Sequence, residues 1–91
     1  MLIRSQDKRK IVNIDNVDSV AAEYGEIKAY NGNTETRIII GDYSKREKAI
    51  KVLDMICEHY QYLQKCKYGL IGIQEINFVF QMPQESEVQD E

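Results

Sequence analysis

The fold is decided by the stretch Gly41-Asp42-Tyr43-Ser44-Lys45-Arg46-Glu47, where short apolar runs give way to one long amphipathic segment. Ser44 is a favoured N-cap residue, because its hydroxyl can accept a hydrogen bond from a backbone N–H of the first helical turn. Glu47 follows at the spacing of the capping box, in which the glutamate carboxylate accepts the N–H of the cap residue. The stretch therefore predicts a helix that begins beside Ser44.

Beyond this cap, apolar side chains recur at the spacing of a helix that lies on a core. They are Ala49, Leu53, Ile56, Tyr60 and Leu63, and the stripe is widened by Ile50, Val52 and Cys57. Lys65 and Lys67 suit the negative end of the helix dipole, and Gly69 suits a left-handed stop. We therefore expect one helix over Lys45 to Lys67.

Short apolar runs separated by turn residues precede the helix and predict several strands. The runs span residues 1–5, 11–14, 17–24, 27–30 and 34–40, and the alanines of 17–24 also permit a short helix. Asn31-Gly32 predicts a tight two-residue hairpin turn, because both residues tolerate positive φ. After the helix, alternation over Ile76 to Met82 predicts a last half-buried strand, which Pro83 ends.

Together these elements predict an α+β domain, in which an antiparallel β meander packs against one long helix and a last strand follows the helix. A strongly curved, half-open barrel plugged by the helix is the alternative geometry. Residues 1–83 are expected to form a single domain, since a chain of 91 residues has no room for two. Residues 84–91 are expected to be a disordered acidic tail. The acidic residues of this tail are Glu85, Glu87, Asp90 and Glu91.

Composition restricts the class of protein. The net charge of −3 argues against a general nucleic-acid binder, which is usually basic. The sequence has no long apolar run for a membrane span and no secretory pattern at Met1, so a cytoplasmic location is expected. Cys57 and Cys66 point to nearly opposite sides of a continuous helix, so they are expected to be reduced. Cys57 is interpreted as a core residue and Cys66 as a near-surface thiol.

No catalytic or metal-binding pattern stands out. His59 is the one histidine, and a zinc site would need about four ligands from cysteine, histidine or carboxylate side chains. Cys57 and His59 diverge on a helix, so they do not share a site. The stretch Gly69-Leu70-Ile71-Gly72 lacks the ending of a phosphate-binding loop. We therefore expect no enzymatic activity, no metal and no cofactor.

The aromatic residues support the leading functional prediction. Tyrosines are common at protein interfaces, and the last strand is a candidate edge for pairing with a second copy of the chain. We therefore expect a non-enzymatic module that binds another protein, of unknown identity, or itself. The candidate interaction surface comprises Tyr24, Tyr30, Tyr60, Tyr62, Phe78 and Phe80.

The basic residues support an alternative, a nucleic-acid-binding accessory protein of a phage or mobile element. Basic side chains beside tyrosines can contact phosphates while the rings stack on bases. The candidate contacts are Arg4, Lys8, Arg9, Lys10, Lys45 and Arg46. The acidic total favours the plainer interpretation, in which these residues are a solvated turn and a solvated first helical turn.

Two parts of the chain carry a resemblance to known proteins. Leu2–Asp7 running into Val12–Val17, and Ile40–Ser44 running into Lys48–Ile56, resemble small uncharacterised bacterial and phage-encoded proteins, and the ending Phe80-Gln81-Met82-Pro83 fits them too. The resemblance covers about half the chain, and its motifs are structural. It implies a small strand-rich domain with one helix and an origin in a mobile element, but no activity and no functional residue.

Overall fold

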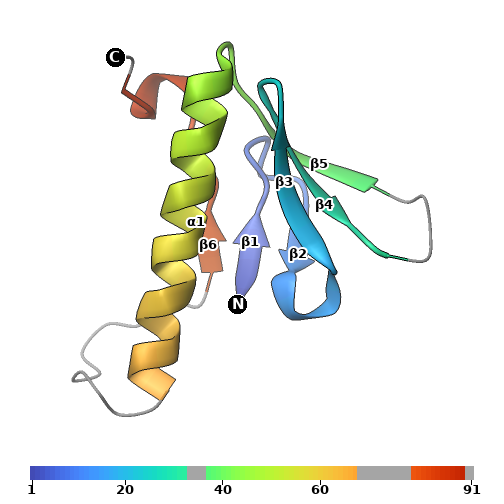
Figure 1. Cartoon of the computed structure of the whole chain (residues 1–91), viewed down its shortest axis with the longest axis vertical. Coiled ribbons are helices and arrows are strands. Elements are labelled where there is room, and N and C mark those ends of the chain that lie inside the picture. The colour runs from blue at the N-terminus through green and yellow to red at the C-terminus, as the bar shows by residue number, and fades with distance from the viewer. Residues whose placement is uncertain (33–36, 68–78, 90–91) are drawn as a thin grey trace.

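The computed structural model of the protein describes residues 1–32, 37–67 and 79–89 (Figure 1). It confirms the α+β class, with strands before and after one long helix, α1, at Arg46–Lys67. Two short 3-10 helices, η1 and η2, lie at Ile14–Asn16 and Glu85–Glu87. The strands are β1 at Leu2–Arg4, β2 at Ile11–Asn13, β3 at Ser19–Glu23, β4 at Glu26–Tyr30, β5 at Arg37–Asp42 and β6 at Val79–Gln81.

The described strands form two three-stranded sheets, with the orders β2-β1-β6 and β3-β4-β5, and they do not close into a barrel. The break between the sheets is η1, where the side-chain oxygen of Asn13 accepts the N–H of Asp15 at 3.1 Å. This local bond ends β2 and redirects the chain, so β3 starts a second sheet instead of extending the first. Strand β6 pairs with β1 in parallel, because α1 carries the chain to the other end of the molecule before it returns.

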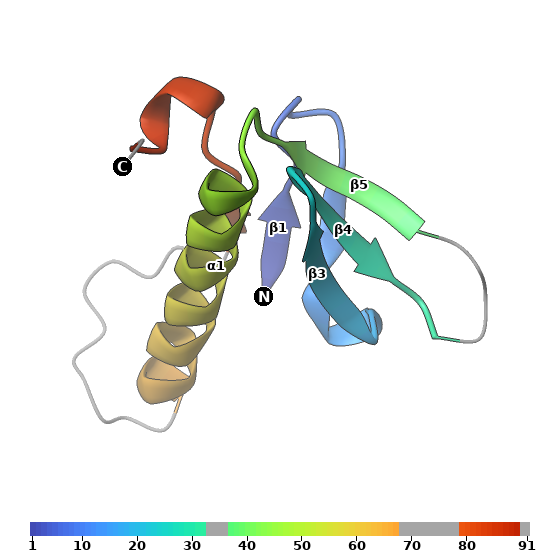
Figure 2. The same cartoon turned by 45° about the horizontal axis from the view of Figure 1, so that its top comes forward.

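The core lies between the helix and the two sheets. Its most buried large side chains are Ile3, Ile27, Ile40, Val52 and Met82. They come from β1, β4, β5, α1 and the residue after β6, so each of these elements is needed to close the core. Figure 2 shows α1 along one side of the molecule and the β3-β4-β5 sheet on the other, with β1 drawn between them as in Figure 1. Burial of each such side chain contributes about 1.5–3 kcal/mol.

Some predicted connections differ from the structure. Tyr30 pairs with Arg37, so the link from β4 to β5 is longer than the two-residue turn that Asn31-Gly32 predicts, and that prediction is wrong. The run 17–24 contains β3 and not a short helix. Residues 79–82 of the strand predicted over Ile76 to Met82 lie in the described ranges: Val79–Gln81 form β6, and Met82 follows it. Residues 33–36 and 68–78 lie outside the described ranges.

The tight hairpin turn of the described chain is at Tyr24-Gly25, between the paired residues Glu23 and Glu26. The carbonyl oxygen of Gly25 accepts the N–H of Tyr43 at 2.8 Å. A Cβ atom added at Gly25 would lie only 2.1 Å from the carbonyl oxygen of Tyr43. Gly25 therefore lets the tip of this hairpin contact the backbone where the chain enters α1.

We expect Gly25→Ala to lower the free energy of unfolding by about 1–3 kcal/mol, because the added methyl group meets backbone atoms that must move. Urea unfolding measured by circular dichroism checks the change. The control is Gln61→Ala on the exposed face of α1, which should stay within about 0.5 kcal/mol of the parent chain. Equal stability of both variants would contradict the close contact.

Candidate functional site

A groove of about 580 Å³ lies between α1 and the segment that joins β2 to β3. Ligand sites typically have volumes of about 300–1,000 Å³. The groove has two apolar walls, and its charged lining residues are both acidic. One wall is formed by Ile14, Val17 and Val20, the other by Leu53, Ile56 and Tyr60, and the acidic residues are Asp15 and Asp18.

The helical wall exists because the apolar stripe of α1 is wider than the core it covers. Val52 and Ile56 face the core and are buried. Leu53, Cys57 and Tyr60 follow along the neighbouring side of the helix, where Leu53 is half-buried and the other two are exposed. Tyr60 keeps 40% of its surface accessible. The outer part of the predicted stripe therefore lines the groove instead of filling the core.

The opposite wall is held by η1 and the start of β3. Val17 and Val20 are half-buried there and pack against the core from its margin. The carboxylate of Asp15 lies 3.4 Å from the amino group of Met1, and the Asp15 side chain is 63% exposed. Asp18 is exposed as well. Two accessible carboxylates beside apolar walls favour a ligand with an apolar body and a cationic group.

The aromatic residues predicted as an interaction surface do not gather on one surface. Tyr60 lines the groove. Tyr24 lies at the tip of the β3–β4 hairpin, 86% exposed and with a φ of 57°. Tyr30 is half-buried, and its hydroxyl donates a hydrogen bond to Glu23. Phe78 lies outside the described residues.

Tyr62 and Phe80 lie with His59 on another side of α1. The ring of His59 is 6.4 Å from that of Tyr62 and 5.5 Å from that of Phe80. A hydrogen bond to Cys66 raises the pKa of Tyr62. Cys66 is buried and Cys57 is exposed. This is the reverse of the prediction, since the buried side of the helix includes Cys66 and not Cys57. His59 thus packs among rings at the core margin.

The basic residues predicted for nucleic acid lie at one end of the molecule but form no continuous basic patch. Lys8–Lys10 occupy the β1–β2 turn, whereas Lys45 immediately precedes α1 and Arg46 begins it. Gln6 joins the two places, since its N–H donates to the Ile40 carbonyl at 2.8 Å and its side-chain oxygen accepts the Asp42 N–H at 2.7 Å. Arg4, the remaining candidate, lies on β1, and its Nε–H donates a hydrogen bond to the Lys8 carbonyl.

Acidic groups are interleaved with these cations. Asp7 accepts hydrogen bonds from the Ser5 hydroxyl and the Arg9 N–H, which lower the pKa of Asp7. Asp42 and Glu47 are exposed on either side of the start of α1. The charge at this end is therefore mixed.

No group of three or more His, Cys, Asp or Glu side chains could hold a metal ion among residues 1–32, 37–67 and 79–89. In the same part of the chain, no helix has the length and apolar character needed to cross a membrane. In these two respects the described residues therefore add no candidate site besides the groove.

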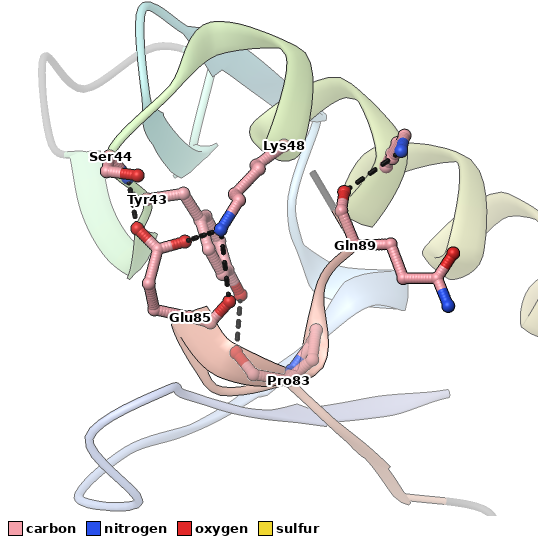
Figure 3. A network of polar contacts seen from close by, with 7 residues as sticks. Tyr43, Ser44, Lys48, Pro83, Glu85 and Gln89 are labelled. Atoms are coloured by element: carbon pink, nitrogen blue, oxygen red, sulfur yellow. Dashed lines mark hydrogen bonds and ion pairs between the residues drawn. The ribbon is translucent and has the colours of Figure 1, made fainter. Parts of the chain in front are cut away.

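The C-terminal segment clasps the start of α1 (Figure 3). The Glu85 carboxylate accepts the Ser44 N–H at 2.6 Å and forms an ion pair with Lys48 at 3.0 Å. The predicted capping box assigns the Ser44 N–H to Glu47, so the partner was wrong: Glu85, distant in sequence, accepts that bond. The hydrogen bonds from Ser44 and the nearby Lys48 lower the pKa of Glu85 to about 2.

Further contacts extend the clasp along the helix. The Tyr43 hydroxyl donates to the Pro83 carbonyl at 2.8 Å, and Lys51 donates to the Gln89 carbonyl at 2.9 Å. Val88 is buried against the core. Gln84–Gln89 therefore differ from the disordered tail predicted for residues 84–91, because one buried apolar side chain and charge-assisted bonds offset the entropy of ordering. Residues 90–91 lie outside the described ranges.

We expect the clasp to depend on pH through Glu85. A carboxyl group whose folded-state pKa is depressed contributes stability above its unfolded pKa, and this contribution is lost as the pH falls through the folded value. The contribution of Glu85 should therefore be complete above about pH 4.5 and vanish toward pH 2. Thermal unfolding of the parent chain and Glu85→Gln from pH 2 to 7 tests this: the variant should have a lower Tm at pH 7 and a shallower loss of Tm in acid.

The matched control is Glu58→Gln on the exposed face of α1, which should retain the acid dependence of the parent. Some acid dependence should remain in Glu85→Gln, because hydrogen bonds also lower the pKa values of Asp7 and Glu23. Identical slopes for the parent and Glu85→Gln would contradict the role of Glu85.

Comparison of the chain with protein-family models, curated protein sequences and solved structures finds no significant match. The resemblance to small bacterial and phage-encoded proteins therefore stays a prediction. The groove, with its apolar walls and its two carboxylates, is therefore the candidate functional site.

Proposed function

We propose that the chain is a non-enzymatic protein-interaction module, which binds an apolar segment of a partner protein in the groove between α1 and the η1–β3 segment. The observation that supports this most is the open apolar lining beside a closed core. Val52 and Ile56 are buried, whereas Tyr60, one turn further along the same helix, is 40% exposed in the groove. Tyrosines in such partly exposed positions are typical of protein interfaces.

The chemistry of the lining supports binding and not catalysis. The described lining offers the thiol of Cys57 and the carboxylates of Asp15 and Asp18, together with the hydroxyls of Ser19 and Tyr60. It contains no histidine or lysine, the usual groups that activate a nucleophile of this kind. Aliphatic walls instead provide contact area for an apolar ligand.

A second candidate, binding of nucleic acid at the other end of the molecule, is supported by Tyr24. This residue is 86% exposed at the tip of the β3–β4 hairpin, and exposed aromatic rings stack on the bases of single-stranded nucleic acid. The carbonyl of its neighbour Gly25 accepts the Tyr43 N–H, which places the hairpin tip beside the backbone that leads into α1. The interleaved acidic groups make this candidate weaker than the groove.

For the groove, we expect a selection from a random peptide display library to yield peptides that bind the immobilised chain. Tyr60→Ala should weaken their binding about tenfold or more, as expected when a central interface tyrosine is truncated. The control is Met55→Ala, since Met55 has the same 40% exposure on α1 but does not line the groove. Failure to select any peptide, or equal binding to Tyr60→Ala and the parent, would refute the proposal.

For the second candidate, a gel-shift titration with single-stranded oligonucleotides should show binding that weakens as salt rises, because phosphate contacts release counterions. Tyr24→Ala should weaken this binding, since a stacked base contributes about 1–3 kcal/mol. Tyr62→Ala, with an exposed tyrosine on a different side of the molecule, is the control. Binding that is absent, or insensitive to salt, would remove this candidate.

A further inference from the structure

We infer that the occupant of the groove is an extended, cationic segment of a partner protein, which adds as a strand to the free edge of β3 and packs its alternate side chains against α1. This inference rests on the proposed function and specifies its binding mode. Four features support this binding mode: the strand order, the position of the groove, the helical wall and the acidic charge of the lining.

The strand order leaves one edge of β3 open. In the order β3-β4-β5, β3 pairs with β4 alone among the described strands. The other edge of such a strand presents backbone N–H and C=O groups that can pair with an added strand. An extended peptide that binds in this way gains main-chain hydrogen bonds from the edge and specificity from pockets for its alternate side chains.

The groove lies beside the start of this edge. Ser19 and Val20 are consecutive residues of β3, so their side chains point to opposite faces of the sheet. Both nevertheless line the groove. A groove over one face would contact every second residue, so contact with both neighbours places the groove along the margin of the strand.

The helical wall matches the repeat of an extended chain. From Leu53 to Tyr60 the helix advances about 10 Å along its axis. Alternate side chains of an extended strand repeat at about 6.6–6.8 Å, so two of them can contact this wall. Of the five residues of β3, Ser19 and Val20 line the groove, so the added segment would pair beside this end of the strand.

The charge selects the occupant. Asp15 and Asp18 are the charged residues in the described lining, and both are accessible acids. A lysine or arginine at one end of the added segment would face Asp18 and the carboxylate of Asp15, which also pairs with the amino group of Met1. A second copy of this chain fits less well, because antiparallel pairing of two β3 strands about their centre would set Glu23 opposite Ser19, next to Asp18, and β3 has no lysine or arginine.

Glu23 remains ionised in that arrangement, since hydrogen bonds from Tyr30 and Lys28 lower its pKa. A second β3 strand would therefore bring another acid and no lysine or arginine to this edge. A basic segment of a different protein is therefore the occupant that the groove favours.

The test uses the tightest peptide selected on the immobilised chain, with one backbone N-methyl group at each position in turn. Only every second N–H of an added antiparallel strand points to its neighbour. Methylation should therefore weaken binding at least tenfold at alternate positions and have little effect between them, as measured by titration calorimetry. Asp18→Asn and Asp15→Asn should each weaken binding about two- to fivefold at low salt, whereas Asp54→Asn on the exposed face of α1 should not.

Other patterns would overturn the inference in distinguishable ways. Binding that Tyr60→Ala abolishes, but that tolerates N-methylation throughout or responds with a helical period, would overturn strand addition and leave the proposed groove function intact. Micromolar self-association that Tyr60→Ala disrupts would identify a second copy as the occupant and overturn the assignment to a different protein. Peptides that bind Tyr60→Ala as well as the parent, or the selection of no peptide, would overturn both proposals.

Discussion

The structure depends on Tyr43, the residue at which sheet, helix and C-terminal segment meet. Its N–H donates to the Gly25 carbonyl, and its hydroxyl donates to the Pro83 carbonyl at 2.8 Å. The ring is buried, with 4% of the residue exposed, and burial raises the pKa of its hydroxyl. A buried hydroxyl without a partner would cost about 1–3 kcal/mol, so the Pro83 bond is part of what permits the ring to be buried. The backbone and side chain of this one residue thus connect the β3–β4 hairpin, the start of α1 and the segment after β6.

The clasp around Tyr43 also explains how a chain of 91 residues leaves apolar surface uncovered elsewhere. A domain of this size buries a smaller share of its surface than a large one, so it has little apolar area to spare. Met82 and Val88 supply core contacts from beyond β6. With these contacts made at one end of α1, Leu53 and Tyr60 are free to line the groove further along the helix.

Local pattern was enough to predict the elements, but not their partners. The apolar stripe and Ser44 placed the start of α1 within two residues of Arg46, where the structure has it. Sequence spacing could not show that Glu85 takes the place of Glu47 on the Ser44 N–H, because that contact joins residues far apart in the chain. The same limit applies to the groove: periodicity showed a broad stripe but not which part of it the sheets would cover, and so Cys57 was placed in the core.

The groove itself follows from a mismatch between helix and sheet. Asn13 ends β2 and starts η1, so no described strand pairs with the outer edge of β3, which stays beside α1. The side of α1 that faces β3 carries apolar residues beyond those that the core covers. An open strand edge invites uncontrolled pairing, and proteins usually counter it with charges at the edge. Asp15 and Asp18 lie beside this edge, and in the proposed binding mode they disfavour acidic segments and favour basic ones.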